Sequence, residues 1–144
     1  MTPKNQVAIP AEFRAACQKR VLAAGFMLRK DAADHLNLYP MPEFHRIRGR
    51  LRAKLESMDD QDRAEALLRE WSVRTAFLPV DQQGRVTLPR EMLAAAGIKG
   101  PVLLFVGCDL RLEIWDAAAR AESGLPEGEY GQWLEANRRG IVGL

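Results

Sequence analysis

The 144-residue sequence predicts an α+β fold of two pseudo-symmetric, small, β-rich units joined by a helical hairpin. Three observations support this fold class. A strand-like segment that runs into a proline and a short helix occurs twice, with Val7 and Val86 separated by 79 residues. An alternating stretch that ends in an aromatic residue also occurs twice, at residues 36–39 and 112–115. Between these two copies, apolar residues recur at helical spacing.

Copy one begins with a segment of strand character. Residues 4–9 alternate and are rich in β-branched side chains, and Pro10 suits the first position of the short helix that follows, up to Arg20. Segments 26–28 and 36–39 then predict the two strands of a hairpin.

Two linking helices follow copy one. The first begins at Pro42 and the second follows Asp60, which can cap it. The first helix also carries a basic run from Arg46 to Lys54. Because the opposite stripe is apolar and glutamates flank the run, we interpret it as a solvated face rather than a DNA-facing patch.

Copy two repeats the pattern of copy one with clearer turn signals. We expect a strand at 73–80, a turn at 81–84, a strand at 85–88, a helix at 89–96 and a hairpin of 102–106 with 110–115. We expect Gly97 to end the helix of copy two. In the C-terminal tail we expect at most one short helix, around Trp133. We divide the chain into copy one, linking helices, copy two and a polar C-terminal tail at residues 1–47, 48–73, 74–119 and 120–144.

Composition is that of a globular protein. Apolar residues make up 47% of the chain and charged residues 28%, and the net charge of +2 permits nucleic-acid binding without arguing for it. The longest apolar run, residues 102–106, is far shorter than the roughly 20 residues of a membrane helix. No signal segment opens the chain, so we expect a cytoplasmic protein in which Cys17 and Cys108 are free thiols.

The segment that starts at Asp81 predicts a tight turn followed by a strand. An aspartate can accept hydrogen bonds from backbone N–H groups two or three residues later, and Gly84 supplies a positive φ. Strand alternation then sends Arg85 and Thr87 to one face and their apolar neighbours to the other. Because the apolar face must be buried, Arg85 is expected to point outward from a rigid turn.

Two interpretations of Arg85 are about equally supported by the local sequence. An arginine held in this way suits a phosphate or the O6/N7 edge of guanine, and a two-stranded ribbon can enter a DNA major groove. The alternative is a surface arginine that pairs with a nearby carboxylate, since short Asp-x-x-Gly-Arg turns are common.

A resemblance favours the first interpretation. The doubled motif of this sequence closely resembles the MraZ family, and the match covers nearly everything up to about residue 119. The segments that carry it are 81–89, 96–98 and 112–116 in copy two, and 9–14 and 38–44 in copy one.

The resemblance implies a bacterial transcription regulator built from two SpoVT-AbrB-type units and associated with the division and cell-wall gene cluster. It implies a nucleoid-associated homo-oligomer, with ring formation as in other members, that binds double-stranded DNA at G-rich direct repeats. The runner-up function is an oligomeric scaffold or partner-binding module of the same fold.

Copy one departs from the family pattern. Thr2, Asn5 and Gln6 stand where the family has Asp, Gly and Arg, although Asn tolerates the positive φ of the turn. In the wider AbrB-like pattern, Lys4 would approach a phosphate and Gln6 a base edge such as adenine, so we expect a changed sequence preference. The family's first strand would lie before Met1, so either the start is mis-assigned or copy one lacks a strand partner.

The expected DNA-binding and turn-forming residues come from both copies. The DNA-binding set is Arg85, Lys4, Gln6, Arg14, Thr87 and Arg90, and the turn-forming set is Asp81, Gly84 and Asn5. His35 and His45 lack ligand spacing, and no nucleophile motif is present, so we expect neither an enzyme nor a bound metal or cofactor.

Overall fold

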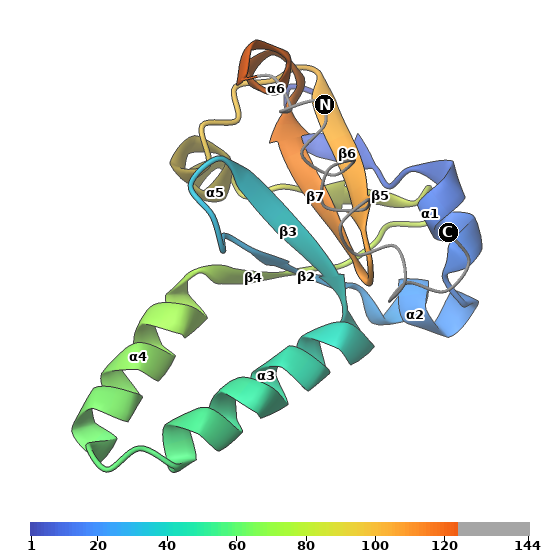
Figure 1. Ribbon diagram of the computed structural model, residues 1–144. Helices are drawn as coiled ribbons and strands as arrows, with labels where there is room; N and C mark the ends of the chain where they lie inside the picture. Colours follow the sequence, from blue (N-terminus) through green and yellow to red (C-terminus); the bar gives the residue numbers. More distant parts are fainter. Residues whose placement is uncertain (124–144) are drawn as a thin grey trace, which may run out of the picture.

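The computed structural model describes residues 1–123, and the helix predicted around Trp133 lies outside them. The strands are β1 (Gln6–Ala8), β2 (Phe26–Arg29), β3 (His35–Pro40), β4 (Thr75–Leu78), β5 (Arg85–Thr87), β6 (Leu103–Cys108) and β7 (Arg111–Asp116) (Figure 1). The helices are α1 (Ala11–Ala16), α2 (Lys19–Ala24), α3 (Met41–Glu56), α4 (Gln61–Val73), α5 (Arg90–Ala95) and α6 (Ala117–Ser123). Both sheets are antiparallel, which confirms the predicted α+β class.

The two copies share both sheets. Strands β1 and β5, one from each copy, form a two-stranded ribbon, and the larger sheet has the order β4-β2-β3-β7-β6. In the larger sheet, β3 of copy one pairs with β7 of copy two, and β4 of copy two pairs with β2 of copy one. Among the described strands, β6 pairs only with β7. The division at residues 47, 73 and 119 and the pseudo-symmetry of the units stay predictions.

A single core lies between the ribbon and the larger sheet. Alternate residues of the central strands are fully buried, among them Leu36, Leu38 and Ile114, each 0% exposed. Val86 of the ribbon and Leu88, the residue that follows β5, belong to the same apolar cluster, and each is 1% exposed. Burial of one apolar side chain of this size stabilises a fold by about 1.5–3 kcal/mol, so this shared core holds the ribbon in place.

Several element boundaries differ from the prediction, most of them by one or two residues, and two of the differences have a clear backbone cause. The helix expected up to Arg20 is two short helices, because Cys17 and Gln18 have extended backbone between α1 and α2. The strand expected from Val73 begins only at Thr75, because α4 continues through Val73.

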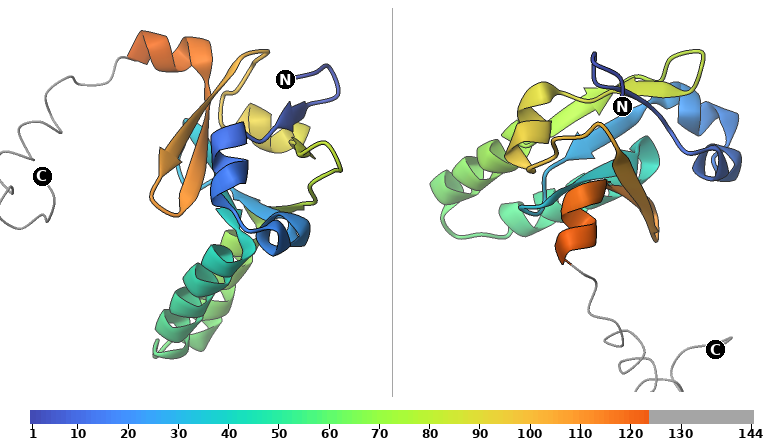
Figure 2. Two further views of the ribbon diagram at one scale, coloured as in Figure 1. Left: turned by 90° about the vertical axis from the view of Figure 1, so that its right-hand side faces the viewer. Right: turned by 90° about the horizontal axis from the view of Figure 1, so that it is seen from above.

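Helices α3 and α4 lie side by side and extend away from the sheets (Figures 1 and 2). Asp60 caps α4, where its Oδ1 accepts a hydrogen bond from the Arg63 N–H at 3.0 Å. Arg29 attaches the hairpin to the larger sheet: it is 3% exposed, donates to the Trp71 carbonyl at 2.7 Å and lies 3.9 Å from the centre of the Trp71 ring. Within residues 1–123, no helix is both long enough and apolar enough to cross a membrane.

Candidate nucleic-acid interface

The β1–β5 ribbon has one polar face that both copies build. In its register Gln6 lies opposite Thr87 and Ala8 opposite Arg85. Directly opposed residues of antiparallel strands share a face, and the face alternates along each strand. Because Val86 points into the core, Gln6, Ala8, Arg85 and Thr87 share the outward face, as alternation predicts for Arg85 and Thr87.

The copy-two turn, residues 81–84, leads into this face at Arg85. Asp81 Oδ1 accepts hydrogen bonds from the backbone N–H groups of Gln83 at 2.9 Å and Arg85 at 2.8 Å. The Asp81 N–H donates to the Arg85 carbonyl at 2.9 Å, and Gly84 has φ 77°. The backbone N–H of Arg85, followed by its side chain and the N–H of Gln83, holds the pKa of Asp81 below its ordinary value. The carboxylate is therefore charged at neutral pH.

The geometry of the Arg85 side chain is compatible with both interpretations left open by the sequence. Its Nε donates to Asp81 Oδ2 at 2.9 Å, so it does pair with a nearby carboxylate. The side chain is nevertheless 37% exposed, and within residues 1–123 no hydrogen bond engages its terminal nitrogens. A guanidinium has five N–H donors, so four are left for an external partner.

The copy-one turn, residues 2–5, has the same backbone hydrogen bonds. Thr2 Oγ1 accepts from the Gln6 N–H at 3.1 Å, and the Thr2 N–H donates to the Gln6 carbonyl at 2.9 Å. Asn5 takes the place of glycine with φ 61°. The loops before β1 and β5 project to the same side of the molecule (Figure 2, left). The copy-one turn therefore forms without a glycine, as the tolerance of asparagine for positive φ predicts.

Each turn lies beside the helix of the other copy. Because β1 and β5 are antiparallel, the end of β1 and the start of α1 lie next to the start of β5. Arg14 donates through Nε to the Ile9 carbonyl at 3.0 Å, and its side chain covers the copy-two turn, where a Cβ on Gly84 would lie 2.8 Å from Arg14 Nη1. Arg14 follows the copy-one turn in sequence but belongs in space to the copy-two turn.

The reciprocal placement holds for Arg90. It lines a pocket of about 400 Å³ together with Asn5 of the copy-one turn and Lys99. The structure therefore groups Arg14 with Arg85 at one end of the ribbon and Arg90 with the copy-one turn at the other. Lys4 in that turn is exposed.

The sequence offered a carboxylate partner for Arg85 as one of two interpretations, but it did not identify that partner as Asp81. The available signal was their spacing, because four residues across a tight turn bring the two side chains together. The position of Arg14 had no local signal, since it depends on pairing between segments about 80 residues apart.

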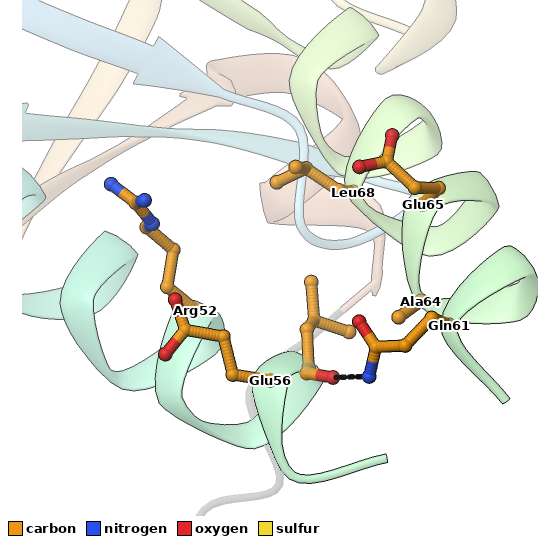
Figure 3. Close-up of a pocket in the computed structure, with 7 residues that line it drawn as sticks. Arg52, Glu56, Gln61, Ala64, Glu65 and Leu68 are labelled. Carbon is orange, nitrogen blue, oxygen red and sulfur yellow. Dashed lines mark hydrogen bonds between the residues drawn. The ribbon is translucent and has the colours of Figure 1, made fainter. Parts of the chain in front are cut away.

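Other polar features of the described residues lie outside the β1–β5 ribbon. A pocket of about 150 Å³ between α3 and α4 is lined by Arg52, Leu55, Glu56, Gln61, Ala64, Glu65 and Leu68, and Gln61 Nε2 donates across it to the Leu55 carbonyl at 3.2 Å (Figure 3). His35 stacks on Trp115 with ring centres 4.3 Å apart. No group of three or more His, Cys, Asp or Glu side chains in residues 1–123 is arranged to hold a metal ion.

Comparison with known proteins identifies the family. Residues 74–119 match the family model described as "MraZ protein, putative antitoxin-like". Over 139 residues the chain is 32% identical to a transcriptional regulator MraZ of Bacteroides thetaiotaomicron, with 92% of this chain and 83% of the relative covered. The chain belongs to the MraZ family.

Two further MraZ relatives agree. The transcriptional regulator MraZ of Salinispora arenicola is 34% identical over 126 residues, covering 88% of this chain and 82% of the relative. That of Paenarthrobacter aurescens is 35% identical over 117 residues, covering 81% of this chain and 75% of the relative. The residues matched by the MraZ family model include Asp81, Gly84 and Arg85.

Proposed function

We propose that the chain is a non-enzymatic, sequence-specific DNA-binding transcriptional regulator that binds G-rich repeats through the outward face of the β1–β5 ribbon. The observation that carries the proposal is Arg85, held by Asp81 on a rigid turn with its terminal nitrogens outside that bond. The B-DNA major groove, about 12 Å wide, admits a two-stranded ribbon, and arginine bound to guanine O6 and N7 is the commonest base-specific contact.

The residues of the face divide into base-reading and backbone-binding roles. Arg85 would bind guanine, and Gln6, at the other end of the ribbon, suits the N6 and N7 atoms of adenine. Thr87 lies opposite Gln6 and offers a hydroxyl to either kind of base. These unlike side chains on one ribbon predict a non-palindromic recognition sequence.

The basic residues around the two turns would bind phosphates. Arg14 lies over the copy-two turn and Arg90 beside the copy-one turn, and Lys4 is exposed between Thr2 and the ribbon. Phosphate contacts fix the position of a protein on DNA without specifying sequence. Binding should therefore weaken steeply as salt rises, because each neutralised phosphate releases counterions.

We infer that several subunits bind together as a homo-oligomer. One ribbon face offers few contacts, and repeated boxes engaged by linked copies would gain affinity through high effective concentration. The relatives named transcriptional regulators support a regulatory role, and the family resemblance supports the division and cell-wall gene cluster as the target and a place at the nucleoid.

A titration of the full chain with a duplex of G-rich direct repeats and with a scrambled duplex tests the proposal. We expect Arg85→Ala to weaken binding to the repeats by about 1–3 kcal/mol per engaged subunit, and to weaken scrambled-duplex binding less, because there only the positive charge is lost. Arg50→Ala removes the same charge from the exposed face of α3 and should have little effect. If the wild-type protein binds repeats no better than scrambled DNA, the regulator proposal is wrong and a scaffold function is favoured.

A further inference from the structure

We infer that Asp81 is the residue that gives the copy-two turn its specificity for guanine, and that Thr2 leaves the copy-one turn without such a positioning group. This inference rests on the proposed function. Asp81 acts by fixing the direction of the Arg85 side chain and need not touch DNA itself.

The backbones of the two turns do not differ in the features that matter. In copy two the Gly84 N–H donates to the Asp81 carbonyl at 3.1 Å, and in copy one the Asn5 N–H donates to the Thr2 carbonyl at 2.9 Å. Each turn is also tied to the other copy, since the Ile9 N–H donates to the Gly84 carbonyl at 3.0 Å and the Leu88 N–H to the Asn5 carbonyl at 2.9 Å. Any difference in recognition must therefore come from the side chains.

The side chains at the first position of each turn differ in their number of acceptors. Asp81 has two oxygens: Oδ1 is used by backbone N–H groups, and Oδ2 accepts from Arg85 Nε at 2.9 Å. Thr2 has one oxygen, and the backbone N–H of Gln6 already occupies it at 3.1 Å. Among the described residues, no side-chain hydrogen bond fixes the direction of Gln6.

A fixed guanidinium favours specific binding because less rotamer freedom is lost when it meets the two acceptors of guanine. The Asp81 charge has the opposite effect on binding to DNA in general, because it repels the phosphate backbone. Removing that charge while keeping the turn should therefore move the two affinities in opposite directions. A purely structural role for Asp81 would lower both.

Asp81→Asn makes this separation. The amide oxygen can still accept from the Gln83 and Arg85 N–H groups, and Asn suits turns of this kind. The amide nitrogen then stands where Oδ2 stood, and as a donor it cannot accept from Arg85 Nε. Asp59→Asn is the matched control, because it makes the same charge change at an exposed bend where no side-chain hydrogen bond is present in the described structure.

The test measures dissociation constants of the wild type, Asp81→Asn and Asp59→Asn for the G-rich repeat duplex and the scrambled duplex. The specificity ratio is the dissociation constant for the scrambled duplex divided by that for the repeat duplex. For Asp81→Asn we expect this ratio to fall about tenfold, with scrambled-duplex binding unchanged or tighter. Asp59→Asn should keep the wild-type ratio. If Asp81→Asn also keeps it, the inference is wrong while the proposed function stands; if the wild type shows no preference, the proposed function fails and the inference with it.

A gain-of-function variant keeps the inference testable if Asp81→Asn unfolds. Gln6→Arg alone should tighten binding to all duplexes alike, because it adds an arginine without a positioning group. Thr2→Asp combined with Gln6→Arg should create a preference for a guanine at the copy-one end of the site. If Gln6→Arg alone gives that preference to the same degree, a positioning carboxylate is unnecessary and the inference is overturned.

Discussion

Substitution of Gly84 by alanine tests the geometry of the copy-two turn. Gly84 has φ 77°, in the left-handed region that L-residues rarely adopt. A Cβ there would also lie 2.8 Å from Arg14 Nη1 and 2.9 Å from Arg14 Cδ. The alanine therefore meets a backbone penalty and displaces the side chain that covers the turn.

The two penalties can be separated by a second glycine. Gly97 has φ 69°, but a Cβ there would meet nothing within 4 Å, so Gly97→Ala carries only the backbone penalty, about 1–2 kcal/mol. In Gly84→Ala the moved Arg14 also gives up its hydrogen bond to the Ile9 carbonyl, which adds about 0.5–1.5 kcal/mol. We expect losses in the free energy of unfolding of about 1.5–3.5 kcal/mol for Gly84→Ala and about 1–2 kcal/mol for Gly97→Ala.

Equilibrium urea unfolding followed by far-UV circular dichroism measures both losses. Gly84→Ala should also weaken binding to G-rich repeats, because the turn that aims Arg85 is distorted, whereas Gly97→Ala should not. Equal losses of stability in the two variants would refute the inferred contact between Arg14 and the turn.

Two further predictions concern stability away from the ribbon. Gly49 lies exposed in α3, and a Cβ there would meet nothing within 4 Å. Gly49→Ala should therefore raise the free energy of unfolding, measured by urea titration, by about 0.5–1 kcal/mol. A lower free energy of unfolding in the variant would contradict the helix at this position. Burial raises the pKa of Asp31, but hydrogen bonds from Asn37 and Tyr39 and the charge of Arg29 together outweigh it, so the pKa lies below its ordinary value. The stabilisation is then present above the ordinary pKa and is lost as pH falls through the lowered one. Asp31→Asn should lower the free energy of unfolding by about 1–2 kcal/mol at pH 7 and make it fall less steeply with pH below about pH 4. If the pH dependence of the free energy of unfolding below about pH 4 is the same in the variant and the wild type, the Asp31 carboxylate contributes nothing to stability.

Local patterns were sufficient to predict much of the fold. The alternation around Val86 predicted which residues of β5 are buried, because a strand with one buried face must place its apolar side chains there. The tolerance of Asn5 for positive φ predicted that the copy-one turn forms. The apolar stripe after Pro42 predicted α3.

Long-range pairing was not predictable from these patterns. Duplication indicates two similar units, but it does not say that β1 pairs with β5, and that pairing places Arg14 on the turn of the other copy. Arg29 was missed for a related reason: a charged residue at a strand end is ordinarily exposed, whereas here Trp71 and Asp31 bury and neutralise it. Asp31 is only two residues from Arg29, but Trp71 comes from α4, so the local sequence carries no sign that Arg29 is buried.

Dimethyl sulfate protection of guanine N7 tests most directly whether Arg85 contacts bases from the β1–β5 ribbon. The wild-type protein, at saturation, should protect specific guanines in the G-rich repeats, because an arginine bound to O6 and N7 blocks methylation. Arg85→Ala, at a concentration that saturates the same duplex, should leave those guanines as reactive as in free DNA. Equal protection by the two proteins would contradict base contact by Arg85.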